Sequence, residues 1–319
     1  MTLDDVPQVE RVTADAFYEL DVATRPADWP APERRPAART EPWRVRLRHL
    51  VNTDADGCWV AEADGEVVGA AAALRREGLW GLSTYAVRPG VQARGIGREL
   101  LDAALSYGSP ESPGIICASH DPRAVRRYRL AGFDLHPALL LWGTVRRSAI
   151  PSLPGVREGG ADDIGLLDEI DRISRGHGHG VDHEVMVTQL ALRIYERGTS
   201  RAYAYLHPSG GPHLLSATDV QSARSVLWAA LEHSAPDTRV DFHNVTAEQS
   251  WALDVGLEAG MEGRIQPVDR YGVRTKTEAV ELALRHLAGQ PMTREEALAM
   301  RGSNAMHEPP ADVVPHGAA

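Results

Sequence analysis

The residues of this sequence whose types and spacing could do chemistry lie between Val87 and Leu101. An apolar, β-favouring run ends at Val87, a proline-containing turn follows, and a helical pattern begins around Gly95 and Gly97. At a helix N-terminus, unpaired backbone N–H groups and the helix dipole attract anions, and glycine allows a phosphate to approach the backbone. Because arginines flank these glycines, the stretch is predicted to bind a pyrophosphate.

Two common phosphate-binding loops do not fit this stretch. It lacks the Gly-Lys-Ser/Thr ending of a nucleoside-triphosphate loop and the third glycine of a dinucleotide fingerprint. The order Val-Arg-Pro-x-x-Gln-x-x-Gly-x-Gly in residues 87–97 instead resembles the acetyl-coenzyme A motif of the GNAT superfamily of N-acetyltransferases. The alternative is an ordinary strand-to-helix turn that binds nothing. The resemblance implies that acetyl-coenzyme A, a co-substrate, is bound by Val87, Arg88, Gln92, Arg94, Gly95, Ile96, Gly97 and Arg98.

A second segment, residues 121–133, resembles the other GNAT signature, Asn-x-x-Ala-x-x-x-Tyr-x-x-x-Gly-Phe, with Asp121 in place of the asparagine. Aspartate can cap a helix, but an ionised carboxylate cannot donate a hydrogen bond to a cofactor. Tyr128 matches the tyrosine that protonates the departing thiolate in many GNAT enzymes. A phenol suits this role because its pKa of about 10 lies near that of a thiol. A tyrosine that only packs in the core is the alternative.

The general base is not identified by the sequence. Many relatives carry a carboxylate on the strand before the motif, but residues 82–86 contain none. Glu62, Glu66 and Glu77 are near in sequence, and a water relay or an amine that arrives neutral is equally compatible. The acceptor is also open: a small amine, an antibiotic, a peptide N-terminus and a protein lysine all fit.

The elements needed to position this chemistry can be predicted on both sides of the motif, and their order is that of the GNAT fold. The segment at residues 22–42 has five prolines and is expected to form an exposed loop. The arginines from Arg34 to Arg48 are expected to form a solvated surface. In chain order we expect helices at 4–20 and 43–50, a hairpin at Asp64-Gly65, a strand at 79–87, a strand at 115–118, a helix at 123–131 and a closing strand at 139–145.

The same plan is expected to repeat after a linker at residues 146–155. A helical opening near Ala161, strands around 202–206 and 214–217, and a capping box at Thr246 match the first copy in order. Where the first copy has glycines and arginines, residues 218–222 have neither, and they include a carboxylate that would repel phosphate. The second copy is therefore interpreted as a GNAT-like domain without a cofactor site.

The C-terminal segment differs from both copies. Residues 274–285 resemble VapB-type antitoxins of ribbon-helix-helix character, but no clear ribbon precedes them. Contact with a protein partner through residues 269–302 is therefore an open interpretation, whereas nucleic-acid binding is not expected. Residues 303–319, rich in Pro, Ala and His, are expected to be disordered.

Bulk properties agree with a globular enzyme. The 319 residues carry a net charge of -10, which disfavours broad binding to nucleic acid. No apolar run could span a bilayer and the N-terminus does not resemble a signal peptide, so a cytoplasmic location is expected. Cys58 and Cys117 are expected to be buried, reduced thiols. The loop from His177 to Glu184 has metal-ligating residue types, but an exposed loop is favoured and no metal is expected.

The fold class predicted from the sequence is α/β, with two tandem GNAT-like mixed-sheet domains and a short helical C-terminal appendage. The predicted function is acetyl-coenzyme A-dependent transfer of an acetyl group to an amine in the first domain. The alternative is a non-catalytic acyl-coenzyme A-binding or regulatory protein that acts on a partner through its C-terminal segment. The predicted units are residues 1–147, 156–268, 269–302 and 303–319.

Overall fold

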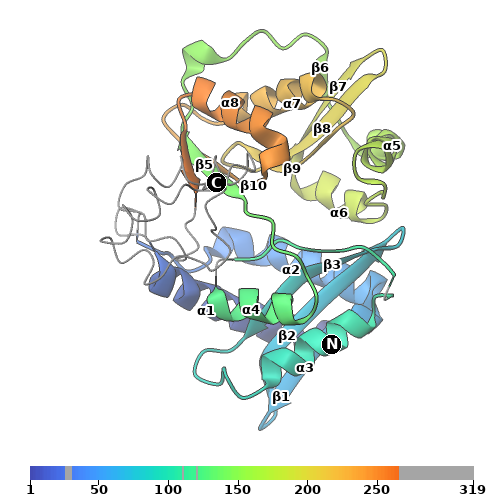
Figure 1. Cartoon of the computed structure of the whole chain (residues 1–319), viewed down its shortest axis with the longest axis vertical. Helices are drawn as coiled ribbons and strands as arrows, with labels where there is room; N and C mark the ends of the chain where they lie inside the picture. The colour runs from blue at the N-terminus through green and yellow to red at the C-terminus, as the bar shows by residue number, and fades with distance from the viewer. Residues whose placement is uncertain (26–30, 110, 120, 266–319) are drawn as a thin grey trace, which may run out of the picture.

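The computed structural model describes residues 1–25, 31–109, 111–119 and 121–265 (Figure 1). The predictions for residues 269–302 and 303–319 lie outside these ranges. Among the described residues, no helix is both long enough and apolar enough to cross a membrane. The elements of the N-terminal half are α1 (Val6–Thr24), α2 (Ala37–Thr53), β1 (Cys58–Ala63), β2 (Glu66–Arg76), β3 (Leu79–Val87), α3 (Ile96–Ser106), β4 (Gly114–Ile116) and α4 (Pro122–Leu130).

The N-terminal half is a four-stranded sheet in the order β1-β2-β3-β4. The first three strands are antiparallel, and β4 is parallel to β3. Strand β2 is rich in alanine, and Ala70 to Ala73 are all fully buried. Because successive side chains of a strand point to opposite faces, Ala70 and Ala72 pack with α1 and α2, whereas Ala71 and Ala73 pack with α3. The small side chains allow helices to lie close to both faces.

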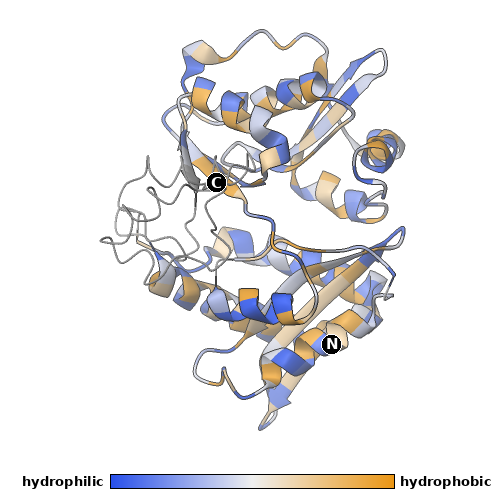
Figure 2. Cartoon of the chain, viewed as in Figure 1, coloured by the Kyte–Doolittle hydropathy of each residue, from blue (hydrophilic) through white to orange (hydrophobic). Residues whose placement is uncertain are grey.

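The C-terminal half has two sheets. Strands β6-β7-β8-β9 form an antiparallel sheet, and β10-β5-β11 form a second one. Figure 2 shows helices of both halves with hydrophobic and hydrophilic residues alternating along them, as expected where one face lies on a sheet. The elements are β5 (Leu139–Thr144), β6 (Val156–Glu158), α5 (Ile164–Arg175), α6 (Asp182–Gln189), β7 (Ala191–Arg197), β8 (Ser200–Leu206), β9 (Pro212–Ala217), α7 (Val220–Glu232), β10 (Arg239–Val245), α8 (Ser250–Glu258) and β11 (Glu262–Ile265).

The predicted closing strand at residues 139–145 forms as β5, but it does not close the first sheet. It lies between β10 and β11, with Trp142 opposite both Asp241 and Glu262. Leu141 is fully buried in a core made largely by the second half. Hydrophobic strands satisfy their backbone groups wherever a partner edge is available, and the sequence pattern alone does not say which edge that is.

Two other local predictions are corrected. Residues 37–42 are not a loop, because α2 begins at Ala37 and contains Pro42. The buried residues Leu47 and Leu50 anchor this helix on the core, which outweighs the one hydrogen bond that a proline removes. Of the two cysteines, Cys58 is buried as predicted, whereas Cys117 is exposed.

The two halves are joined by buried ion pairs across α2, β2 and α6. Asp182 at the start of α6 accepts hydrogen bonds from Arg76 (2.6 and 2.9 Å) and contacts His49 (2.8 Å). Arg76 also donates to Asp54, and its side chain is only 8% exposed. Burial opposes ionisation of Asp182, but the hydrogen bonds from His49 and Arg76 outweigh it and lower the pKa of the carboxyl group.

Asp182→Asn is therefore expected to destabilise the chain by about 2 kcal/mol at pH 7, because it removes one charged partner of a buried guanidinium. The pKa of Asp182 is lowered in the folded chain, so its contribution is present above the unfolded pKa of about 4 and is lost as the pH falls further. Denaturant titration at several pH values measures both effects. Glu41→Gln, in an exposed pair with Arg48, is the control and should cost less than about 0.5 kcal/mol.

Candidate active site

Strand β3 has an open edge at its C-terminal end. Its parallel pairing with β4 covers only three positions and ends at Leu82, opposite Ile116. On its other side, β3 stays paired with β2 as far as Val87. The register of that pairing jumps from Leu82 to Thr84, so Ser83 is an extra residue and forms a β-bulge. Bulges redirect side chains and often lie beside active sites. Beyond Leu82, residues 83–87 therefore have no strand partner on the β4 side within the described part of the chain.

The turn after β3 presents a row of free backbone donors. Gly90, Ala93 and Gly95 have positive φ angles, of 81°, 65° and 92°, and Gly95 is the N-cap of α3. Within the described part of the chain, the N–H groups of residues 92–97 donate no hydrogen bond. Free donors combined with the positive end of the α3 dipole make an anion site. Binding of a pyrophosphate at this turn stays a prediction from the sequence.

The predicted cofactor-binding side chains do not all face this site. Arg88 is held by Glu66 of β2 at 2.7 Å, and its backbone N–H donates to Val68, so the side chain is tied to the hairpin. Arg94 is exposed. Arg98 is also exposed and makes only a loose pair with Asp102 at 3.4 Å. Both Arg94 and Arg98 can therefore reach a phosphate.

Gln92 links the turn to the second signature segment. Its Nε2 donates to the carbonyl oxygen of Val87 (3.1 Å), and its Oε1 accepts from Arg123 of α4 (2.8 Å). Arg123 also binds Asp121, which caps α4 by accepting from the Arg123 backbone N–H at 2.9 Å. The capping role predicted for Asp121 is thus confirmed. Arg123 was not selected from the sequence, where nothing distinguishes it from its arginine neighbours.

Tyr128 lies beneath the cofactor turn, close to Tyr85. The two rings are 6.1 Å apart, and the Tyr85 hydroxyl donates to the carbonyl oxygen of Gly97 at 2.6 Å. Tyr128 is 7% exposed, and its hydroxyl makes no hydrogen bond to the described residues. Burial raises the pKa of Tyr128, and Tyr85 and Asp121 raise it further. The phenol therefore keeps its proton at neutral pH and is available as an acid.

The equivalent turn in the second half is already occupied. Asp219 caps α7, and its side chain accepts from the backbone N–H of Ser222 at 2.9 Å. It also accepts hydrogen bonds from Ser200 and Thr218. A carboxylate at this position satisfies a donor that a phosphate would need, and it repels a second anion.

Residues 14–133 match the model of the family described as "Acetyltransferase (GNAT) family". This stretch, just over a third of the chain, is therefore similar to the GNAT acetyltransferases. The match starts within α1 and ends directly after α4, so it takes in the open edge of β3, the free amides and Tyr128. It stops before β5, the strand that pairs with the second half.

Several solved structures resemble the chain well beyond the GNAT segment. A presumed acetyltransferase from Pyrococcus horikoshii aligns with a TM-score of 0.62 at 19% identity, over 83% of this chain and 84% of that one. A GCN5-related N-acetyltransferase from Kribbella flavida aligns with a TM-score of 0.50 at 18% identity, over 76% of this chain and 62% of that one. At these identities the likeness concerns the fold. No curated protein matches the sequence.

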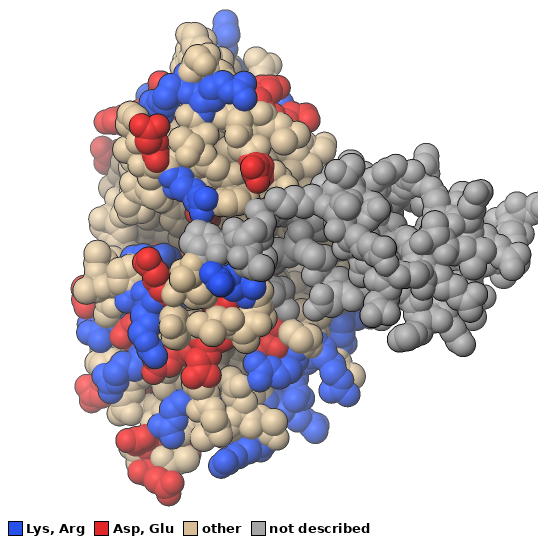
Figure 3. All heavy atoms as spheres, turned by 90° about the vertical axis from the view of Figure 1, so that its left-hand side faces the viewer, with Lys and Arg blue, Asp and Glu red and all other residues tan. Residues whose placement is uncertain are grey.

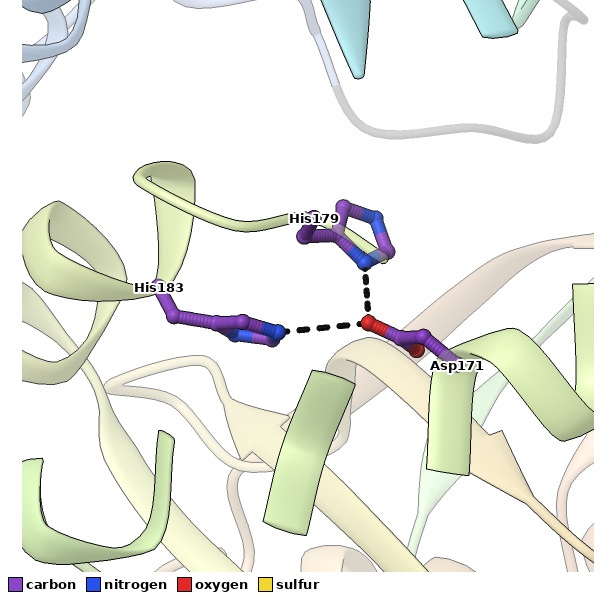
Figure 4. A group of neighbouring side chains, drawn as sticks. All are labelled: Asp171, His179 and His183. Atoms are coloured by element: carbon purple, nitrogen blue, oxygen red, sulfur yellow. Dashed lines mark hydrogen bonds and ion pairs between the residues drawn. The ribbon is translucent and has the colours of Figure 1, made fainter. Parts of the chain in front are cut away.

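A cluster of two histidines and an aspartate lies in the second half (Figure 4). Asp171 Oδ2 is 2.6 Å from His179 Nδ1 and 3.2 Å from His183 Nε2, and the Tyr203 hydroxyl donates to Oδ1 (2.7 Å). The sequence predicted an exposed loop from His177 to Glu184. That prediction is wrong for the last residues of the segment, because α6 begins at Asp182 and His183 is fully buried. The buried partner Asp171 was missed because it lies on another helix, α5.

This cluster has the residue types of a metal site. Each of the hydrogen bonds between a histidine and Asp171 can, however, be made by a ring N–H group without a metal. His179 can donate from Nδ1 to Asp171 while its Nε2 accepts from Arg175 at 2.9 Å. His183 can likewise donate to Asp171 and accept from Tyr205 at 3.2 Å. A metal on His179 Nδ1 would make Nε2 a donor facing the Arg175 donor. The cluster therefore reads as a structural network in the core.

That network supports a contact between the halves at the β2–β3 turn. Arg172 binds the Glu77 carboxylate, and the backbone N–H of Gly178 donates to it at 2.8 Å. The side chain of His177 reaches the Glu77 carbonyl oxygen (2.9 Å). Hydrogen bonds from Arg172 and Gly178 lower the pKa of Glu77 to about 2. Glu77 is therefore an ionised interface residue and a poor general base.

Proposed function

We propose that the chain transfers the acetyl group of acetyl-coenzyme A to an amine, and that the reaction takes place in the N-terminal domain, residues 1–147. The observation that carries the proposal is the row of free N–H groups at residues 92–97, which lies beside the open edge of β3. The pyrophosphate would bind those amides with help from Arg94 and Arg98. The pantetheine arm would then lie along β3, displacing the contact of Gln92 with Val87.

In the proposed reaction the lone pair of the amine nitrogen forms a bond to the thioester carbonyl carbon, and the C–S bond breaks. The nitrogen loses a proton to solvent, and the departing thiolate takes a proton from Tyr128, which regains one from water. The raised pKa keeps Tyr128 protonated at neutral pH, but it also makes the phenol a weaker acid than in solution, so the support for Tyr128 comes from its match to the second signature segment. The occupied turn at Asp219 supports a single cofactor site, in the first half.

A non-catalytic, acyl-coenzyme A-binding role is the second candidate. It is favoured by the lack of a carboxylate among residues 82–86 and by the position of Asp121, which is fully engaged with Arg123. An assay for free thiol released from acetyl-coenzyme A, run with a panel of amines, distinguishes the enzyme from the non-catalytic binding protein. Turnover on any amine supports the enzyme. Coenzyme A binding by calorimetry with no turnover on any amine would support the second candidate.

A further inference from the structure

Arg46 of α2 holds its guanidinium group at the bulge of β3. Its Nη1 donates to the Ser83 carbonyl oxygen at 3.4 Å and also to the Ser83 hydroxyl, and its Nη2 donates to the Thr84 hydroxyl at 3.1 Å. A guanidinium has five N–H groups, so Nε–H and one N–H of Nη2 have no partner in the described ranges. These free donors lie where β3 separates from β4, beside the strand along which the pantetheine arm is proposed to lie.

Arg46 has no carboxylate partner among the residues that the structure describes. Within the described ranges no acidic side chain lies within ion-pairing distance of it, although burial lowers the pKa of its guanidinium to about 10 and the nearby charge of Arg35 lowers it further. The neighbouring Arg35 and Arg44 share one buried carboxylate, that of Glu10, at 2.7 and 3.3 Å. Glu10 thus serves two guanidinium groups, and no ion pair joins it to Arg46 in the described ranges, in a chain whose net charge is negative.

The expectation of a solvated surface holds for Arg34, Arg39 and the side chain of Arg48, which are exposed, but not for Arg35 and Arg44. The side chains of Arg35 and Arg44 are only 13% and 27% exposed, and Arg35 lies over the ring of Trp43. On the outer face drawn in Figure 3, basic and acidic side chains lie side by side. The side chains of Arg35, Arg44 and Arg46 are therefore only partly shielded from solvent. A partly buried cation with no counter-ion among the described residues is costly to maintain, which is expected where the counter-ion arrives with a ligand.

The second half faces this position with mostly uncharged groups. His207 and His213 flank the β8–β9 turn, with ring centroids 4.8 Å apart. Burial lowers the pKa of His213 to about 4, and the charges of His207, Arg46 and Arg39 lower it further. The pKa of His207 is also lowered, mainly by burial. The acidic group on this side, Asp241, is already hydrogen-bonded to His243. Neutral imidazoles add no negative charge that would repel an anion.

We propose that the acceptor is an amine that also carries a carboxylate group, and that this carboxylate pairs with the free N–H groups of Arg46. The inference rests on the proposed acetyl transfer. A carboxylate matches the planar fork of a guanidinium and can bind it through two hydrogen bonds. With its carboxylate fixed at the bulge, a small amino acid would have its amine beside the open edge of β3, within reach of the thioester.

The test compares amino acids with their carboxamides and with the amines that lack the carboxylate, for example alanine, alaninamide and ethylamine. An aminoalkylphosphonate is added as a second anion. We expect kcat/KM to be at least about 10-fold higher for the amino acid than for its carboxamide or for the amine without a carboxylate. A factor of about 10 corresponds to the contribution of one hydrogen-bonded pair of charged groups. Arg46→Gln should remove this preference, mainly by raising KM, and Arg46→Lys should restore part of it.

Two controls show whether a lost preference for the carboxylate is due to the Arg46 side chain itself. Affinity for acetyl-coenzyme A should be unchanged in Arg46→Gln, which shows that the fold and the cofactor site are intact. Arg48→Gln, an exposed arginine of the same helix, is the matched control and should not change the preference. The comparison among amines uses the unmodified chain and so does not depend on whether a variant folds.

The outcomes separate this inference from the proposed function. Equal turnover of the three matched compounds, or a carboxylate preference that survives Arg46→Gln, would overturn the inference and leave acetyl transfer standing. A preference for the phosphonate over the carboxylate would also overturn it, in favour of another anion. Cofactor binding without turnover of any amine would overturn the proposed function, and this inference with it.

Discussion

Gly97→Glu is expected to weaken binding of acetyl-coenzyme A by about 100-fold or more, equal to roughly 3 kcal/mol. A Cβ atom at this position would lie 2.7 Å from the Tyr85 hydroxyl, which is itself fixed by a hydrogen bond to the Gly97 carbonyl. The carboxylate would also place negative charge at the N-terminus of α3, among the amides proposed to bind the pyrophosphate. Calorimetry with coenzyme A measures the loss.

Two further variants separate the steric effect from the effect of charge. Gly97→Ala combined with Tyr85→Phe removes the oxygen that the new Cβ would meet, so this pair should bind better than Gly97→Ala alone. Gly165→Glu is the control, because Gly165 lies in the first turn of α5 with nothing within 4 Å of a Cβ. Wild-type affinity in Gly97→Glu would mean that the cofactor binds elsewhere.

Tyr128→Phe is expected to lower kcat by about 100-fold or more, which is the typical contribution of a positioned acid. The Tyr128 hydroxyl makes no hydrogen bond to the described residues, and its ring packs near Tyr85. Phenylalanine keeps that packing, so stability and cofactor affinity should change little. Steady-state kinetics, together with calorimetry on the same protein, measures the two effects separately.

The pH dependence gives a second test of Tyr128. Because burial, Tyr85 and Asp121 raise its pKa above the ordinary value of about 10, the acid stays protonated throughout the neutral and mildly alkaline range. Activity should therefore not fall between pH 7 and about pH 9.5 through loss of this proton. Tyr195→Phe, a buried tyrosine of the second half, is the control. A Tyr128→Phe variant with unchanged kcat would assign the residue to packing alone.

The unequal roles proposed for the two halves rest on single residues at corresponding turns. The first turn ends in Gly95, whose positive φ and missing side chain leave the following amides free. The second ends in Asp219, whose carboxylate satisfies an amide of α7. The second half instead contributes contacts: Arg172 and Gly178 hold Glu77 at one end of the β2–β3 hairpin, and Asp182 holds Arg76. The other end of β3 carries the proposed site.

The sequence by itself determined the local parts of this site. The turn at residues 88–97, the capping of α4 by Asp121 and the helix carrying Tyr128 depend on backbone preferences and on neighbours within a few positions. Such features can be read from glycine, proline and capping residues without knowing the tertiary fold. The cofactor turn was therefore predictable, and so was the lack of an equivalent turn before α7.

Only the tertiary structure decided which distant residues meet. Arg46 and Ser83 come together across 37 positions of the chain, and the bulge that exposes Ser83 depends on the register between β2 and β3. The sequence pattern of β5 gives a strand but not its partners, because any open edge can satisfy its backbone groups. The pairing of Asp171 with His179 and His183 likewise requires two helices to pack. Contacts of this kind depend on long-range packing, which residue spacing does not encode.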